Sequence, residues 1–413
     1  MRLQARRLRL LRTLAAITFL SFMGKLFLMQ VVQGSDVASK VVRQNTIERT
    51  LTAPRGEIQD INGLPLAVTS DSYNITADQT LIRNPEATAK VLAPVIGADV
   101  TALTQHLTGT RRFVYIAKEV SPLDLRRVQD LNLAGVYSEP STRRVYPQGE
   151  LAANVIGFVD ATGSGAGGVE HTYNRLLAGT PGRVEYMQAG GTTPIPTGDR
   201  QVTDPVPGTT VRLTIDRDVQ WIAQRAIAER VAYARAKSGT VIVLDTTNGH
   251  ILAMATTPTF DPNSVRTANP ADLGNRAVSD VYEPGSTAKV MTMAALIESG
   301  IAGPLDHYVV PWRLRWKDYQ TFHDHNQHAT EKLTLTGILA KSSNVGTIKA
   351  ASPMDNAALY ANLEKFGIGE RTGAGLAGES PGILPRLRNW NIITFPTVAF
   401  GQGLSVTALQ VAQ

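Results

Sequence analysis

Residues 282–300 constrain the fold of this chain more than any other segment, because they join a tight loop to a long apolar helix. A Pro-Gly pair ends the loop, residues 290–297 are almost all apolar, and Gly300 follows them. A helix that is apolar nearly all round is typical of a buried core. The segment therefore predicts a folded domain with a buried helix that opens at Ser286.

Ser286 and Lys289 lie one turn apart in this helix, so their side chains share one face. The helix N-terminus adds a positive partial charge where an alkoxide would form. A serine becomes a nucleophile when a base takes its proton, and a lysine is a base only if burial lowers its pKa. We predict that Ser286 is a nucleophile and Lys289 its general base. Alone, however, the pattern Ser-x-x-Lys also fits a solvated lysine beside a helix cap.

A second motif, Ser-x-Asn, follows at Ser342 and Asn344. A second hydroxyl near a nucleophile can relay a proton to a departing amine, and a carboxamide can both donate to and accept from a peptide bond. We predict Ser342 as the proton relay and Asn344 as a substrate-binding residue. Another copy, at residues 72–74, lies far upstream in strand-like sequence, and we interpret it as structural.

The motifs and their surroundings resemble those of a class B penicillin-binding protein, a monofunctional peptidoglycan transpeptidase, and most of all the septal, cell-division type. Residues 55–63 read R-G-E-I-Q-D-I-N-G, close to the family's R-G-x-I-x-D-R-N-G, with Ile61 where an arginine is usual. The other matching segments are R-V-Y-P from Arg144, G-V-E from Gly168, L-A-G-T-P-G from Leu177, N-R-A from Asn275, L-T-L-T-G-I-L-A-K-S-S-N-V-G from Leu333 and G-Q-G-L-S-V-T from Gly401.

This resemblance implies a mixed α/β chain in four parts. They are a cytoplasmic tail (1–13), a transmembrane helix (14–32), a non-catalytic α+β pedestal of the dimerisation type (36–203), and a serine transpeptidase domain with an antiparallel sheet flanked by helices (204–413). The activity implied is cross-linking of peptidoglycan stem peptides through an acyl-enzyme on Ser286 during septal synthesis. The implied ligands are D-Ala-D-Ala stem peptides and β-lactams, without metal or organic cofactor. The implied partners are a multipass lipid II polymerase and other division proteins.

The amino terminus itself predicts a membrane anchor. The net charge is +6, but five arginines and no acid lie among the first twelve residues, which leaves +1 for the rest and no footprint of nucleic-acid binding. The apolar run that follows is long enough to span a bilayer, if Lys25 snorkels or faces a partner helix. Basic flanks stay inside, so the bulk of the chain should be extracytoplasmic, which suits a sequence without cysteine. A cleaved signal peptide is the alternative, although no convincing cleavage site follows the run.

Several local elements follow from turn and periodicity signals. Asn62-Gly63 predicts a hairpin between residues 57–58 and 66–67, and Asn248-Gly249 predicts one between residues 241–245 and 251–255. Residues 211–215 read as a strand. Asp216 should cap a helix with one apolar face, made of Val219, Ile222, Ala223, Ala226 and Ile227.

Two further patterns are interpreted as having no chemical role. Residues 237–239 spell the family's third motif, K-[ST]-G, but they precede the nucleophile, whereas the third motif of the family follows the second. Residues 323–328, H-D-H-N-Q-H, suggest a metal site, but they lack helical i, i+4 spacing and a separate carboxylate cluster. We expect this segment to be a solvated loop.

Two other functions use the same motifs. A D,D-carboxypeptidase or β-lactamase differs in that water resolves the acyl-enzyme, and the large pre-catalytic half argues against it. A membrane-anchored scaffold or β-lactam sensor without turnover would keep the anchor and Ser286. We also expect the 413 residues to be a C-terminally incomplete copy that is poorly active, because no K-[ST]-G follows Ser342.

Overall fold

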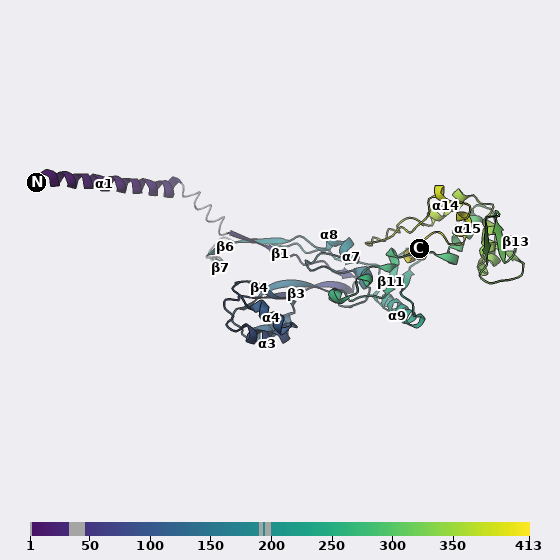
Figure 1. Cartoon of the computed structure of the whole chain (residues 1–413), viewed down its shortest axis with the longest axis horizontal. Helices are drawn as coiled ribbons and strands as arrows, with labels where there is room; N and C mark the ends of the chain where they lie inside the picture. Colours follow the sequence, from purple (N-terminus) through teal and green to yellow (C-terminus); the bar gives the residue numbers. More distant parts are fainter. Residues whose placement is uncertain (1, 33–45, 190–192, 195–199) are drawn as a thin grey trace. The chain divides into compact units, whose positions relative to one another are not determined.

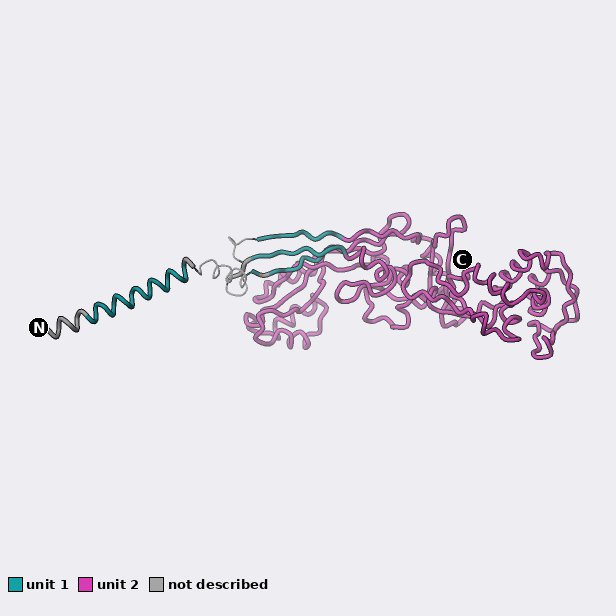
Figure 2. The backbone as a smooth tube through the Cα atoms, turned by 90° about the horizontal axis from the view of Figure 1, so that it is seen from above, with its two compact units in different colours: residues 1–54, 179–207 teal, residues 55–178, 208–413 magenta. Residues whose placement is uncertain are grey.

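The computed structural model of the protein describes residues 2–32, 46–189, 193–194 and 200–413. Residues 36–45, the start of the predicted pedestal, lie outside the described residues. The chain forms two compact units, one of residues 1–54 and 179–207 and the other of residues 55–178 and 208–413 (Figure 2). Both helices and strands are abundant, so the predicted mixed α/β class is confirmed.

The first unit begins with helix α1 (Arg2–Phe27), which continues as a short π-helical stretch, Leu28–Val32 (Figure 1). The 21 residues Leu10–Gln30 are long and apolar enough to cross a membrane, and none of this span is buried against protein. Exposed apolar side chains are what a lipid environment favours. The helix agrees in place and length with the predicted anchor.

A four-stranded sheet completes this unit. Strand β1 (Thr46–Leu51) pairs antiparallel with β6 (Gly182–Ala189), from Thr46 opposite Met187 to Leu51 opposite Gly182. Strand β8 (Arg200–Thr203) pairs with the other edge of β6, and β7 (Thr193–Pro194) pairs with its last residues.

The second unit contains a five-stranded sheet in the order β4-β3-β2-β9, with β5 also paired to β3. Its strands are β2 (Ile58–Gln59), β3 (Pro65–Ala77), β4 (Val114–Val120), β5 (Val136–Val145) and β9 (Val211–Arg212). Helices α3 (Pro85–Ile96), α4 (Val100–Leu107) and α5 (Pro122–Asp130) share a core with β3 and β4. The hairpin around Asn62-Gly63 is confirmed as β2–β3, whereas the predicted strand 211–215 shrinks to the two residues of β9.

Three segments of the family pattern meet at one buried carboxylate. Glu170 is fully buried, and its two oxygens each accept a hydrogen bond at 2.6 Å, one from Nε of Arg55 and one from Nε of Arg144. The hydroxyl of Tyr146 lies 3.3 Å from the same group, and burial raises the pKa of this tyrosine. The attraction between two cations and one anion offsets much of the free energy that is lost when these groups are removed from water. The interaction ties the loop before β2 to the end of β5 and to helix α7 (Gly168–Thr172).

The hairpin that opens the second half of this unit is β10 (Gly239–Leu244) with β11 (Ile251–Thr257), as predicted from Asn248-Gly249. Asp216 caps α9 (Arg217–Ala234), also as predicted. The predicted apolar face of α9 is partly wrong. Ala223 is buried, but Ile222 is 61% exposed, because the residues that pack on the hairpin are spaced four apart along a single stripe.

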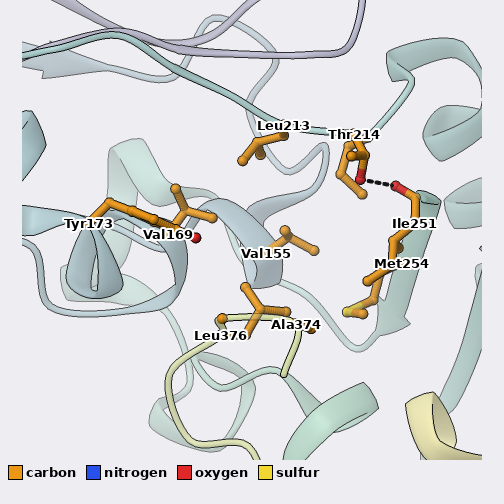
Figure 3. A pocket seen from close by; sticks show the side chains of 11 residues that line it. Val155, Val169, Tyr173, Leu213, Thr214, Ile251, Met254, Ala374 and Leu376 are labelled. Atoms are coloured by element: carbon orange, nitrogen blue, oxygen red, sulfur yellow. Dashed lines mark hydrogen bonds between the residues drawn. The ribbon is translucent and has the colours of Figure 1, made fainter. Parts of the chain in front are cut away.

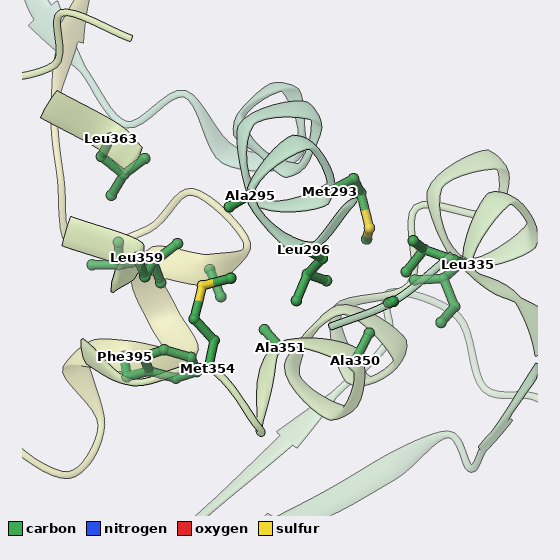
Figure 4. Close-up of a cluster of buried hydrophobic side chains, with 14 of the residues drawn as sticks. Met293, Ala295, Leu296, Leu335, Ala350, Ala351, Met354, Leu359, Leu363 and Phe395 are labelled. Atoms are coloured by element: carbon green, nitrogen blue, oxygen red, sulfur yellow. The ribbon is translucent and has the colours of Figure 1, made fainter. Parts of the chain in front are cut away.

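Helix α11 (Lys289–Glu298) packs on α13 (Asn344–Ala351) and α14 (Asn356–Lys365). Their shared core gathers Met293 and Leu296 from α11 with side chains from the facing helices (Figure 4). The prediction that this helix is buried all round is wrong, because Val290 is 57% and Ile297 48% exposed. The buried face is the one that carries Lys289.

The remaining elements are short. The paired strands are β12 (Val281–Tyr282) with β17 (Val406–Thr407), β13 (His307–Val310) with β16 (Glu331–Thr334), and β14 (Arg313–Trp316) with β15 (Gln320–His323). The helices are α6 (Ala153–Ile156), α8 (Asn174–Leu177), α10 (Arg276–Ser279), α12 (Leu335–Ala340), α15 (Thr394–Ala399) and α16 (Ala408–Ala412).

Candidate active site

Ser286 lies in a 3-10 turn, Gly285–Ala288, that leads into α11. Gly285 has a φ of +56°, and its N–H donates to the Gly401 carbonyl at 2.9 Å. A Cβ on Gly401 would lie 1.9 Å from the Gly285 carbonyl oxygen, so this close approach requires glycine. The α-helix itself begins at Lys289 rather than at Ser286, and the exposed serine stands just before it.

Lys289 is fully buried, and its amine meets three oxygens. Nζ lies 3.1 Å from Oγ of Ser286, 3.1 Å from Oγ of Ser342 and 2.5 Å from the Ser342 carbonyl oxygen. A neutral amine has two hydrogens and one lone pair. It can donate both hydrogens to Ser342 while its lone pair accepts the hydroxyl proton of Ser286. The structure thus brings together the predicted nucleophile, base and relay.

Burial lowers the pKa of Lys289 from 10.5 to about 8, and the negative charge of Asp324 acts in the opposite direction. Removing the amine from water penalises its charged form, whereas a nearby carboxylate favours it. A pKa near 8 leaves a substantial neutral fraction close to neutral pH. That fraction is what a general base requires.

Ser342 reaches the amine because helix α12 ends in a tight turn. The N–H groups of Ser342 and Ser343 donate back to the carbonyls of Leu339 and Ile338, and Ser342 takes a φ of +56°. Glycine is the usual residue in this left-handed position. A serine in this conformation is strained, but both its carbonyl and its hydroxyl then point at Nζ of Lys289.

Asn344 is the first residue of α13, and its half-buried side chain donates from Nδ2 to the His323 carbonyl at 3.3 Å. This amide contact orients the carboxamide against the end of β15. The predicted substrate-binding residue therefore lies two positions from Ser342 on the same turn.

The interpretation of residues 323–328 as a solvated loop is wrong for Asp324. Its side chain is buried, and its carboxylate accepts from Oγ of Ser343 at 2.6 Å and from the N–H of Val345 at 2.9 Å. His328 lies 3.1 Å from the same carboxylate. Sequence gave no signal for this, since the loop reads as wholly polar. Across the described residues, no group of three or more His, Cys, Asp or Glu side chains is placed to hold a metal ion.

The other Ser-x-Asn copy lies within β3, where Asn74 accepts the N–H of Glu119 at 3.1 Å. Its position in a strand agrees with the structural interpretation. The early K-[ST]-G pattern ends at Gly239, the first residue of β10.

A hollow of about 80 Å³ lies apart from these residues, between α6, α7, β11 and residues 213–215, which follow β9 (Figure 3). Apolar side chains such as Val155, Val169 and Met254 line it. The hydroxyl of Thr214 at its edge already donates to the Ile251 carbonyl at 2.8 Å. Most of its lining is therefore apolar.

Two family profiles match the chain. The penicillin binding protein transpeptidase domain matches residues 239–413, and the penicillin-binding protein dimerisation domain matches residues 50–213. The peptidoglycan D,D-transpeptidase FtsI of Escherichia coli is 31% identical, with 97% of this chain and 68% of the relative aligned. The chain is a class B penicillin-binding protein.

Within this family, penicillin-binding proteins PbpB of Mycolicibacterium smegmatis and of Mycobacterium tuberculosis are both 34% identical over 94% of this chain. The chain spans 64% and 60% of the length of these two relatives. Among solved structures, a peptidoglycan synthetase from Bifidobacterium adolescentis aligns with a TM-score of 0.68 and 35% identity over 89% of this chain and 71% of the other. Penicillin binding protein 3 of M. tuberculosis complexed with ampicillin aligns with 0.64 and 30%, over 88% and 63%.

The left-handed backbone of Ser342 predicts an unusual order of stabilities. Ser342→Ala and Ser342→Gly lose the same hydroxyl, but only glycine adopts a φ of +56° without strain. In denaturant titrations, we expect the free energy of unfolding of Ser342→Gly to be about 1 kcal/mol higher than that of Ser342→Ala. The matched control is Ser352, at the end of α13 with a φ of −57°, where glycine should be the less stable of the two. Equal stability of the two Ser342 variants would contradict the account.

Proposed function

We propose that this protein is a peptidoglycan D,D-transpeptidase that cross-links stem peptides through a serine acyl-enzyme, in septal cell-wall synthesis. The observation that carries the proposal is the buried Lys289 amine, held within 3.1 Å of the hydroxyls of both Ser286 and Ser342. A base shared by two hydroxyls suits a reaction with two proton transfers. Relatives of the chain are named peptidoglycan D,D-transpeptidase and penicillin-binding protein, which supports the same reaction class.

Acylation begins when neutral Lys289 takes the hydroxyl proton of Ser286. The serine oxygen then bonds to the carbonyl carbon of the penultimate D-Ala of one stem peptide. As the tetrahedral intermediate collapses, the bond to the terminal D-Ala nitrogen breaks. Ser342 gives its proton to that leaving amine and regains one from Lys289. The product is an ester on Ser286 and free D-Ala.

Deacylation uses the same groups in the reverse direction. The amine of a second stem peptide attacks the ester carbonyl and loses a proton to Ser342, which passes one to Lys289. Lys289 returns a proton to the Ser286 oxygen as the ester bond breaks. The new amide bond is the cross-link. The backbone N–H of Ser286 is our candidate oxyanion donor, and Asn344 our candidate for orienting the donor peptide. A β-lactam, which mimics D-Ala-D-Ala, would acylate Ser286 and leave it blocked.

The two family profiles, at residues 50–213 and 239–413, support a division of the chain into two domains. We assign residues 36–203 to a non-catalytic pedestal and residues 204–413 to the catalytic domain, since Ser286, Lys289, Ser342 and Asn344 all belong to the second range. Partnership with a multipass lipid II polymerase and other division proteins rests on the family resemblance. Copurification with such a polymerase after cross-linking in cells tests it, and its consistent absence would count against it.

Labelling by a fluorescent penicillin tests the nucleophile and the base. In the whole protein produced from its own reading frame, Ser286→Ala should reduce the labelling rate by about four orders of magnitude or more. Lys289→Arg should fail nearly as badly, because arginine keeps the charge but does not give up its proton. Ser299→Ala, an exposed serine at the other end of α11, is the control and should label normally. An adduct found by mass spectrometry on another residue, with Ser286 intact, would refute the assignment.

The arginine bias around α1 supports an orientation with the amino terminus in the cytoplasm and residues from 36 onward outside the cytoplasmic membrane. The chain has no cysteine, so single cysteines report sidedness cleanly. A membrane-impermeant maleimide added to intact spheroplasts should label Asp318→Cys, which lies on an exposed turn, and should spare Gln4→Cys. The reverse pattern would exclude this topology.

A further inference from the structure

The proposed reaction assigns no role to Asp324, the single carboxylate of residues 323–328. It accepts hydrogen bonds from Ser343, Val345 and His328, at 2.6, 2.9 and 3.1 Å. The other ring nitrogen of His328 lies 2.7 Å from the Ala329 carbonyl oxygen. Both nitrogens thus face acceptors, which favours the doubly protonated ring, and these contacts raise the pKa of His328.

These contacts place Asp324 at the start of α13, behind the turn that carries Ser342. Ser343 caps the helix by accepting the N–H of Gly346 while it donates to Asp324. The N–H of Val345 has no partner within the helix and would be unsatisfied without the carboxylate. The Asp324 side chain therefore holds Ser343 and Val345, the residues on both sides of Asn344. Ser343 is also the residue that directly follows Ser342.

The same turn delivers the oxygens that bind Lys289. The amine contacts the carbonyl and the hydroxyl of Ser342, whose left-handed backbone must be held in place by its surroundings. When Lys289 takes the proton of Ser286 it becomes a cation in a buried position. A fixed negative charge nearby stabilises that cation, as the buried aspartate of a serine protease triad stabilises its imidazolium.

We propose that Asp324 is a positioning residue of this site, which holds the Ser342–Asn344 turn against Lys289 and stabilises the lysine cation that forms when Ser286 is deprotonated. The proposal rests on the proposed acyl-transfer function. It adds a residue that touches neither substrate nor nucleophile, and it acts through Ser343 and through its charge.

Among the described residues, the charge of Asp324 acts on Lys289 of α11 and on His328 of its own loop, whose Nε2 lies 3.1 Å from the carboxylate. Glu331 also acts on His328, but it lies 2.5 Å from Lys341, which offsets its charge. Loss of the Asp324 charge should therefore be felt chiefly by Lys289 and His328. Because the charge favours protonated lysine, its removal should let Lys289 lose its proton at lower pH.

The experiment measures the rate of acylation by a fluorescent penicillin between pH 5.5 and 10, a range of about two units or more on either side of the lysine pKa. In the wild type the rate should rise with pH as Lys289 becomes neutral. In Asp324→Asn the plateau should fall by about tenfold to a hundredfold. The rising limb of the rate–pH curve, where Lys289 loses its proton, should also move to lower pH by roughly one unit. A role in folding alone would lower the plateau without moving the limb.

Two further variants separate position from charge. Ser343→Ala keeps both charges, so it should lower the plateau and leave the limb in place. Asp318→Asn removes a carboxylate from an exposed turn of the neighbouring hairpin and should match the wild type in both. If Asp324→Asn does not fold, as judged by thermal unfolding, Ser343→Ala decides the positioning role.

A wild-type profile for Asp324→Asn, an unmoved limb in that variant, or a wild-type plateau for Ser343→Ala would overturn the proposal. Failure of the proposed function would look different, because the wild type itself would then not be acylated on Ser286.

Discussion

The buried amine of Lys289 is the interaction on which this site depends. It is fully enclosed by protein, yet it stands within hydrogen-bonding distance of two hydroxyls and one carbonyl. Enclosure makes the amine a usable base at moderate pH, and the three oxygens keep it from being an unsatisfied polar group in a core. Each neighbouring element can be understood by how it maintains this arrangement.

Three elements maintain it. Helix α11 presents Lys289 on its buried face because Met293 and Leu296 anchor that face in the core shared with α13 and α14 (Figure 4). The Gly285–Gly401 contact sets the turn that carries Ser286. The left-handed end of α12 brings Ser342 over the amine. In all three, the position of the backbone decides which groups reach the site.

Much of this could be predicted from sequence, where the signal is local. Turn chemistry at Asn62-Gly63 and Asn248-Gly249 located both hairpins, and the capping residue Asp216 located the start of α9. The spacing of Ser286 and Lys289 predicted their contact. Long-range packing could not be predicted, because the exposure of Val290 and Ile222 depends on which face of each helix packs against other elements. Asp324 was missed because its burial comes from pairing with Ser343, nineteen positions away in the chain, in a segment that looks solvated.

The most direct test of the account is the ionisation of Lys289 itself. NMR of the whole protein with ¹³C-labelled lysine, with the signal assigned by its loss in Lys289→Arg, follows this amine through a pH titration. The account predicts that the Lys289 resonance titrates near pH 8. Titration at the ordinary lysine value of 10.5 would contradict it, because a lysine protonated throughout the physiological range could not take the proton of Ser286.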